Sequence, residues 1–299
     1  MVAPDWLAAL KDLYPFASNF LDLGPHRLHY LDEGEGETLL MLHGNPTWSF
    51  YYRTLVQGLR HQNRCIVPDH MGCGLSDKPQ DYPYTLSTHI DNLEKLVLEL
   101  GLDDITLVLH DWGGAIGMGF AFRHPEKVRR CVVFNTAAFL SSRIPWRIDV
   151  CRNPILGPLA ILKCNAFAGL GTWMASRRRG RMTQRVRQGY LGPYQTPADR
   201  IAHLRFVQDI PLTAEVPSHA VVKDMQSRLE EFRDRPFLII WGLQDFCFDQ
   251  HYLDRWQRYF PEAEVHTIAD AGHYVVEDAY EEIIPFIIEF LRRNPISIR

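Results

Sequence analysis

The chain has 299 residues, a formal net charge of −4 at pH 7 and 46% hydrophobic residues, which is ordinary for a globular protein. No apolar run approaches the roughly 18 residues of a membrane-spanning helix, so no membrane span is expected. The start of the chain lacks a basic segment followed by an apolar one, which argues against a secretory signal. The 6 cysteines are scattered without a Cys-x-x-Cys pair, and they predict reduced thiols in a cytoplasmic protein without a metal site.

The charge is unevenly distributed along the chain. Residues 139–215 contain 12 Lys and Arg against 4 Asp and Glu, so this segment is basic and the remainder is acidic. The densest run is Arg177-Arg178-Arg179-Gly180-Arg181, which we interpret as a solvated helix face. No recognition motif accompanies it, so no nucleic-acid partner is expected. Attraction between the basic segment of one copy and the acidic remainder of another could also support a homo-oligomer.

The first third of the chain alternates short apolar runs with helical patterns. We expect strands on both sides of a Gly24-Pro25 turn within residues 16–33, at Thr38–Leu42 and at Arg64–Pro68. We expect helices at Ser49–Arg60 and at Thr85–Leu100, the second of which ends at Gly101.

The stretch from Ile105 to Ala115 determines how the whole chain is organised. A run of β-branched and apolar residues ends abruptly at Asp111, and Gly113, Gly114 and a small helical segment to about Phe122 follow. This pattern predicts a buried parallel strand that turns sharply into a helix, with Asp111 at the apex.

A carboxylate at this apex narrows the chemistry. A serine that attacked a saturated carbon would form an ether, which water cleaves poorly, whereas a carboxylate forms an ester that activated water can hydrolyse. Asp111 is ionised at neutral pH and requires no activating base. The residue therefore suits displacement at an sp³ carbon, with loss of halide or opening of a strained ring. The alternative is an acid that only caps the following helix.

The second half of the chain predicts an interrupted sheet. A strand at Val128–Asn135 extends the alternation, which indicates a parallel sheet covered on both faces. From about Ala138 to Pro217 there are helix-like runs but no convincing strand, at Ile155–Phe167, Thr183–Tyr190 and Pro197–Gln208. The alternation then resumes with helices at His219–Phe232, Gln250–Tyr259 and Glu281–Arg293 and strands at Phe237–Trp241 and Glu264–Ala269. We therefore predict a core formed by residues 1–138 and 217–299 and a helical cap formed by residues 139–216.

Residues that follow the last two predicted strands complete a catalytic arrangement. His273 follows the last strand, where a loop can direct its imidazole towards the apex carboxylate. Asp245 follows the strand before it and can hold His273 in the required tautomer, with Asp249 and Asp270 as competing acids. Asn135, after the sixth strand, has no carboxylate and leaves this role to Asp245. The chain order of acid nucleophile, Asp and His is that of α/β-hydrolases.

Two further residues are expected to bind a leaving group. Trp112 can direct its indole N–H into the site, and Asn45, in the loop His43-Gly44-Asn45-Pro46, can supply an amide N–H. Together they would form a neutral two-donor clamp for a departing anion, and their backbone N–H groups would form an oxyanion hole. The alternatives are a core aromatic for Trp112 and a turn residue for Asn45.

These segments resemble the haloalkane dehalogenases of the α/β-hydrolase superfamily. The similarity is carried by residues 43–48, 69–79, 110–114 and 272–273, and it extends over nearly the whole chain. It implies an α/β-hydrolase fold with a mostly parallel eight-stranded sheet, helices on both faces and an inserted helical cap. It also resembles the third dehalogenase subfamily, whose members often form large oligomers.

Position by position, the resemblance implies a role for each of five residues. Asp111 would be the nucleophile, His273 the base and Asp245 its partner. Asn45 and Trp112 would bind halide. The implied activity is that of a haloalkane dehalogenase, which converts a small apolar substrate through an alkyl ester of Asp111 into an alcohol, halide and a proton. No cofactor or metal is implied.

Single residues separate related families. Epoxide hydrolases usually have Phe where Asn45 stands and use two cap tyrosines, for which Tyr190 and Tyr194 are candidates. Fluoroacetate dehalogenases have Arg where Trp112 stands. The β-lactone decarboxylases of bacterial olefin biosynthesis are similar at all five positions, and residues 135–139 also resemble them. Decarboxylation of a long-chain β-lactone to an olefin is therefore the main alternative, ahead of epoxide hydrolysis and of a catalytically silent binding module.

Overall fold

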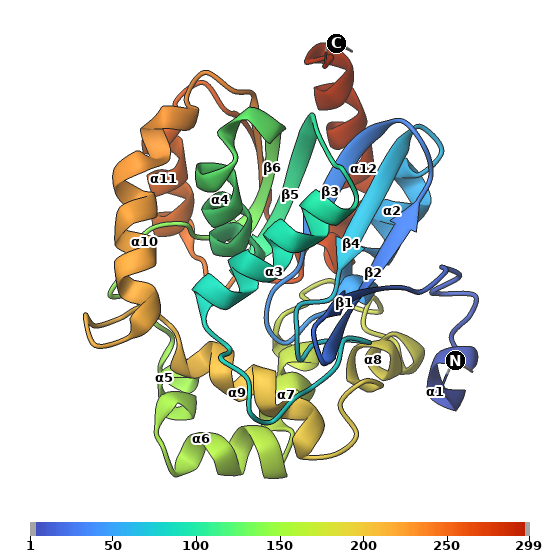
Figure 1. The fold of residues 1–299 in the computed structure, drawn as a ribbon, viewed down its shortest axis with the longest axis vertical. Coiled ribbons are helices and arrows are strands. Elements are labelled where there is room, and N and C mark those ends of the chain that lie inside the picture. The colour runs from blue at the N-terminus through green and yellow to red at the C-terminus, as the bar shows by residue number, and fades with distance from the viewer. Residues whose placement is uncertain (1–3, 297–299) are drawn as a thin grey trace.

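An eight-stranded sheet forms the centre of the molecule. A computed structural model describes residues 4–296 (Figure 1). The strands are β1 Asn19–Leu23, β2 His26–Glu33, β3 Glu37–Leu42, β4 Asn63–Pro68, β5 Ile105–Asp111, β6 Val128–Thr136, β7 Phe237–Gly242 and β8 Glu264–Ile268. Their spatial order is β1-β2-β4-β3-β5-β6-β7-β8. The β1–β2 and β2–β4 pairs are antiparallel and the other pairs are parallel, so the predicted mostly parallel sheet is confirmed.

Helices cover both faces of this sheet. The α-helices of the described residues are α1 Asp5–Ala8, α2 Arg53–Leu59, α3 Leu86–Glu99, α4 Trp112–Arg123, α5 Trp146–Arg152, α6 Leu156–Pro158, α7 Ala166–Met174, α8 Gln184–Leu191, α9 Ile201–Gln208, α10 Pro217–Arg228, α11 Gln250–Tyr259 and α12 Val275–Arg293. Helices α3, α4, α10 and α11 contribute to the core on one face. Helices α2 and α12 contribute to the core on the other face (Figure 1).

The strands divide their side chains between these two cores. In β3, Leu40 and Leu42 belong to one core, whereas Leu39 and Met41 belong to the other. Successive side chains of a strand point to opposite faces, so a strand covered on both sides is apolar at most successive positions rather than at alternate ones. The continuous apolar runs of β3, β5, β6 and β7 meet this requirement.

Between β6 and α10 the chain forms helices and no strand, and these helices lie beyond the carboxyl ends of the central strands (Figure 1). We refer to residues 139–216 as the cap, and these exact boundaries stay a prediction. The single helix predicted at Ile155–Phe167 is wrong. The chain forms α6, a π-helical turn at Leu159–Lys163 and a break at Asn165, whose φ of 49° is left-handed, before α7 begins. Asn tolerates this conformation better than other non-glycine residues, which explains the position of the break.

Two other helices differ from the sequence-based expectation. Helix α5, which begins after Pro145, was not expected. Helix α12 begins at Val275 rather than at Glu281, and it contains a kink at Ala279, where φ is −138°. The kink interrupts the helical periodicity, so only the part of α12 beyond it has the regular pattern that the sequence reveals.

The basic run Arg177–Arg181 is not a solvated helix face, and that interpretation is wrong. It lies in an irregular segment after α7. Arg178 forms ion pairs with Asp270 (2.8 Å) and Glu282 (2.6 Å), and Arg181 pairs with Glu281 at 2.7 Å. The run therefore connects the cap through ion pairs to the first turns of α12 and to the loop before it. No helix of residues 4–296 is long and apolar enough to span a membrane.

Candidate active site

Asp111 lies at the apex of the turn between β5 and α4, as the sequence predicts. Its backbone has φ 51° and ψ −126°, a strained conformation for a residue with a side chain. The loop after β3 approaches so closely that a Cβ on Gly44 would lie 1.9 Å from Oδ1 of Asp111. Glycine at this position therefore makes room for the carboxylate.

Two backbone N–H groups and burial determine the electrostatics of this carboxylate. The N–H of Asn45 donates to Oδ1 of Asp111 at 2.7 Å. Burial is the largest influence and raises the pKa of Asp111, whereas His273 and hydrogen bonds from the N–H groups of Trp112 and Asn45 act to lower it. The two N–H groups expected to form an oxyanion hole therefore contact the carboxylate directly.

His273 lies between two carboxylates. Its Nδ1 is 2.9 Å from Oδ2 of Asp245, and its Nε2 is 3.8 Å from Oδ2 of Asp111. Burial acts to lower the pKa of His273, but the charge and hydrogen bond of Asp245 and the charge of Asp111 outweigh it and raise that pKa above 6.5. The arrangement fixes the ring and favours its protonated form.

The other acids considered for this role have different partners. Asp249 accepts from the N–H of His251 at the start of α11 and pairs with Arg143 at 3.1 Å. Asp270 pairs with Arg178. Asn135 exchanges hydrogen bonds with the backbone of Gly242 at 2.9 and 3.0 Å and so links β6 to β7.

The side chains of Asn45, in the loop after β3, and Trp112, at the start of α4, both line a cavity beside Asp111. One N–H of the Asn45 amide donates to the backbone carbonyl of His203 in α9 at 3.2 Å. An amide nitrogen carries a second hydrogen, which remains for an anion in the site. The Trp112 ring packs against Phe206 of α9, with ring centroids 5.2 Å apart. Cap helix α9 thus holds both residues of the expected clamp.

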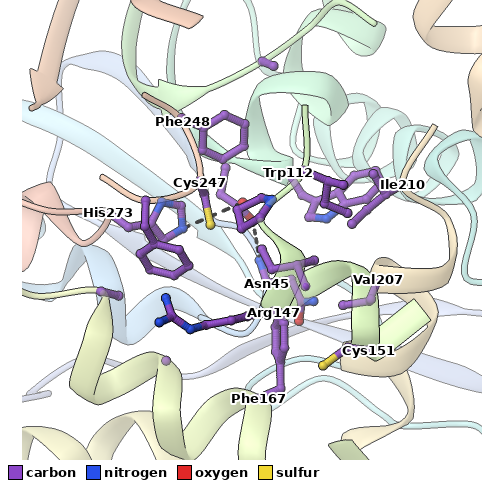
Figure 2. Close-up of a pocket in the computed structure, with 18 of the residues that line it drawn as sticks. Asn45, Trp112, Arg147, Cys151, Phe167, Val207, Ile210, Cys247, Phe248 and His273 are labelled. Carbon is purple, nitrogen blue, oxygen red and sulfur yellow. Dashed lines mark hydrogen bonds and ion pairs between the residues drawn. The ribbon is translucent and has the colours of Figure 1, made fainter. Parts of the chain in front are cut away.

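A cavity of about 240 Å³ connects these groups to the cap (Figure 2). Asn45, Asp111, Trp112 and His273 line it, and Asp245 lies behind His273, outside the lining. On the cap side, the wall is formed by residues of α5 and α7 and by the segment after α9. The surroundings are mostly apolar, so a hydrophobic substrate with one polar reacting centre fits the cavity best.

Other lining residues escaped prediction from the sequence. Cys247 and Phe248 lie beside His273, and Arg147 and Phe167 face the site from the cap (Figure 2). Tyr274 also lines the cavity, and its buried hydroxyl has no hydrogen-bond partner among residues 4–296. Adjacency to His273 in the sequence was the one signal that pointed to Tyr274.

Asp245, Cys247 and His273 also place three potential metal-ligand atoms within 4.8 Å of one another. A metal at this position would require a thiolate and a free imidazole nitrogen. Burial raises the pKa of the Cys247 thiol well above its ordinary value, and Nδ1 of His273 already pairs with Asp245. These residues therefore fit a proton-transfer site better than a metal site.

The two tyrosines considered for epoxide hydrolysis do not face the cavity. The Tyr190 hydroxyl donates to Oε2 of Glu277 at 2.8 Å, and the Tyr194 hydroxyl accepts from the N–H of Gly74 at 2.9 Å. Neither residue belongs to the cavity wall. These two residues therefore do not supply the hydroxyl pair that epoxide opening would require.

Comparison with known proteins identifies the family of the chain. The model of the alpha/beta hydrolase fold family matches residues 37–154 and 171–280. The chain belongs to this family. This α/β-hydrolase is similar to a cis-3-alkyl-4-alkyloxetan-2-one decarboxylase of Shewanella oneidensis. The two sequences are 47% identical over 288 residues, which cover 94% of this chain and 90% of that protein.

Similarity to haloalkane dehalogenases is lower. The α/β-hydrolase is 32% identical to haloalkane dehalogenase 2 of Mycobacterium bovis, over 93% of this chain and 96% of that protein. The crystal structure of the haloalkane dehalogenase DatA from Agrobacterium tumefaciens superposes with a TM-score of 0.82 at 25% identity, covering 93% of this chain and 96% of that chain. The family predicted from the sequence is confirmed, and the order of similarity favours the decarboxylase alternative over the dehalogenase.

Proposed function

We propose that this α/β-hydrolase is a decarboxylase of cis-β-lactones that carry two alkyl substituents. The observation that carries this proposal is the 47% identity to an oxetan-2-one decarboxylase across 94% of the chain, against 32% to a haloalkane dehalogenase. The mostly apolar cavity around a buried carboxylate supports it, because such a substrate is apolar except for its strained ring.

In the first step, Asp111 attacks the saturated ring carbon C4. A bond forms between the carboxylate and C4, and the bond between C4 and the ring oxygen breaks. The electron pair goes to that oxygen, so the leaving group is the carboxylate on C3. The side-chain N–H groups of Asn45 and Trp112 would bind this carboxylate where a dehalogenase would bind halide.

In the second step, the ester intermediate fragments. The bond between C3 and the carboxylate carbon breaks and releases CO₂, and its electron pair forms the C3–C4 double bond. The bond between C4 and the Asp111 oxygen breaks, and this regenerates the Asp111 carboxylate. The protonated imidazole of His273, 3.8 Å away, stabilises the returning negative charge. The products are an alkene and CO₂, and no water is consumed.

Haloalkane dehalogenation is the second candidate, because the same five residues would support it. Halide would leave from the carbon that Asp111 attacks, and neutral His273 would activate water to hydrolyse the ester. The two reactions therefore differ in the protonation state of His273 and in the use of water.

Parallel turnover tests the proposal. Purified protein is incubated with a cis-3,4-dialkyl-β-lactone, 1,2-dibromoethane and 1-bromohexane, while alkene and bromide release are measured. We expect rapid alkene release with little bromide, and its loss by several orders of magnitude in Asp111→Ala. Bromide release that depends on Asp111, without alkene, would make the protein a dehalogenase.

A single turnover in water labelled with oxygen-18 separates the mechanisms further. Hydrolysis of the ester by water attack on its carbonyl introduces the label into Asp111, whereas fragmentation leaves Asp111 unlabelled. Mass spectrometry of the peptide that contains Asp111 measures this. For the lactone we expect no label, and labelled Asp111 after alkene release would contradict the proposed second step.

A further inference from the structure

The cap exposes large apolar side chains on one set of neighbouring helices. Six side chains between the start of α5 and the end of α7 are about half exposed or more, namely Trp146, Ile155, Leu156, Leu159, Leu170 and Trp173. Trp146, Ile155 and Trp173 are exposed by 70 to 76%. Over the rest of residues 4–296, Leu98 is the one large apolar side chain exposed to this extent. We call these six residues the cap apolar face. Clustered exposure of this kind marks an interaction site rather than ordinary surface.

The cap apolar face adjoins the cavity wall. One side of α7 lines the cavity, and Leu170 on that side is both part of the lining and 59% exposed. On α5, the exposed Arg147 also lines the cavity (Figure 2). In the sequence it directly follows Trp146. Helix α5 packs against α6, and α7 packs against the π-helical turn at Leu159–Lys163, so the exposed side chains lie on adjoining elements.

The charges around the face have one predominant sign. Residues 139–175 contain four basic side chains against one acidic side chain. Two of the four, Arg143 and Arg152, form ion pairs with Asp249 and Asp149. The guanidinium of Arg147 lies 5.1 Å from the ring centre of Trp146, and that of Arg187 lies 5.7 Å from the ring centre of Trp173. Tryptophan beside arginine on an apolar helical surface is typical of segments that lie in the interface of an anionic membrane.

We propose that the cap apolar face docks the enzyme on the surface of an anionic lipid bilayer, with the cavity open towards the lipid. The indoles and aliphatic side chains would enter the boundary between headgroups and acyl chains, and the arginines would contact lipid phosphates. Pairing of two caps through this face would place like charges together and close the cavity, which disfavours a second copy as the occupant. The use of this docking for dialkyl β-lactones rests on the proposed function, since such substrates partition into lipid.

Vesicle flotation tests the docking itself. The full chain is mixed with phosphatidylcholine vesicles that contain one-third phosphatidylglycerol, and with vesicles of phosphatidylcholine alone. We expect binding to the anionic vesicles that weakens at high salt. In Ile155→Glu/Trp173→Glu the partition coefficient should fall by about tenfold or more, because two inserted apolar groups become charged. Neither residue lines the cavity.

The matched control is Leu98→Glu/Ile288→Glu, which adds the same charge at exposed apolar positions outside the cap. This variant should retain most vesicle binding. Equal loss in both variants, or no binding of the unchanged chain to anionic vesicles, would overturn the proposal. A dimer in analytical ultracentrifugation that Ile155→Glu/Trp173→Glu dissociates would assign the face to self-association and also overturn it.

Turnover separates this proposal from the proposed function. With a short, water-soluble β-lactone, Ile155→Glu/Trp173→Glu should retain the kcat of the unchanged chain. With a long-chain lactone presented in anionic vesicles, its kcat/KM should fall with vesicle binding. Vesicle binding without turnover of any lactone would reject the decarboxylase and leave the docking surface intact.

Discussion

His273 is the residue whose protonation distinguishes the two candidate reactions. Asp245 and Asp111 raise its pKa above 6.5, so at that pH the imidazolium predominates in the free protein. Alkene release benefits from the imidazolium and should therefore persist as pH falls through 6.5 and decline as pH rises through the raised pKa. Bromide release requires the neutral base and should show the opposite dependence. The pH profiles of kcat for both products measure this difference.

The acidic limb of the alkene profile reports a second group. Burial raises the pKa of Asp111, so alkene release should lose rate at low pH as this carboxylate is protonated, at a pH above its ordinary value of 3.8. In His273→Phe, the alkaline decline of alkene release should disappear, and an alkyl ester should accumulate with 1-bromohexane. An alkaline decline that survives in His273→Phe would show that another group is responsible.

At the scale of elements, the strands were predictable because each requirement is local. A buried parallel strand is apolar at most successive positions, and this pattern is visible in the sequence. The same applies to Asp111 and His273, because the ends of such strands are where site residues stand. The cap was less predictable, since residues such as Arg147 and Phe167 reach the cavity only through tertiary packing. Local periodicity carries no information about which helix covers which strand end.

The junction of α7 and α12 depends on one buried acid, Asp278. Its carboxylate accepts from the Ser176 hydroxyl at 2.5 Å, from the N–H of Arg177 at 2.9 Å and from the N–H of Gly272 at 2.8 Å. Asn at this position would replace one acceptor oxygen by a donor that faces N–H groups. We expect Asp278→Asn to lower the free energy of unfolding by about 2–4 kcal/mol and to lower kcat, because Gly272 precedes His273.

Urea unfolding and turnover measure the two effects of Asp278→Asn. The control is Asp270→Asn in the same loop, which removes an exposed ion pair with Arg178 and should leave the unfolding midpoint nearly unchanged. Similar behaviour of the two variants would contradict the view that Asp278 is the residue that joins the cap to the catalytic loop.

Over the whole molecule, the uneven distribution of charge along the sequence corresponds to ion pairs between the cap and the core. The basic excess of residues 139–215 and the acidic remainder attract each other within one chain, at the contact between the cap and α12. Composition alone could reveal the asymmetry but not its partner, because the acids at 270–282 lie far away in the sequence. The oligomeric state stays a prediction.

Salt should therefore act on the attachment of the cap. Arg178 pairs with Asp270 and Glu282, and Arg181 pairs with Glu281, all at 2.6 to 2.8 Å and all partly exposed. Screening weakens such pairs, so the Tm in high salt should fall by roughly 2–4 °C relative to low salt. Differential scanning calorimetry measures this shift. Arg178→Gln/Arg181→Gln should have a lower Tm at low salt and a flatter salt dependence, because the screened pairs are already absent. A Tm that rises with salt equally in both proteins would mean that repulsion over the whole surface, rather than attraction at this contact, governs the response.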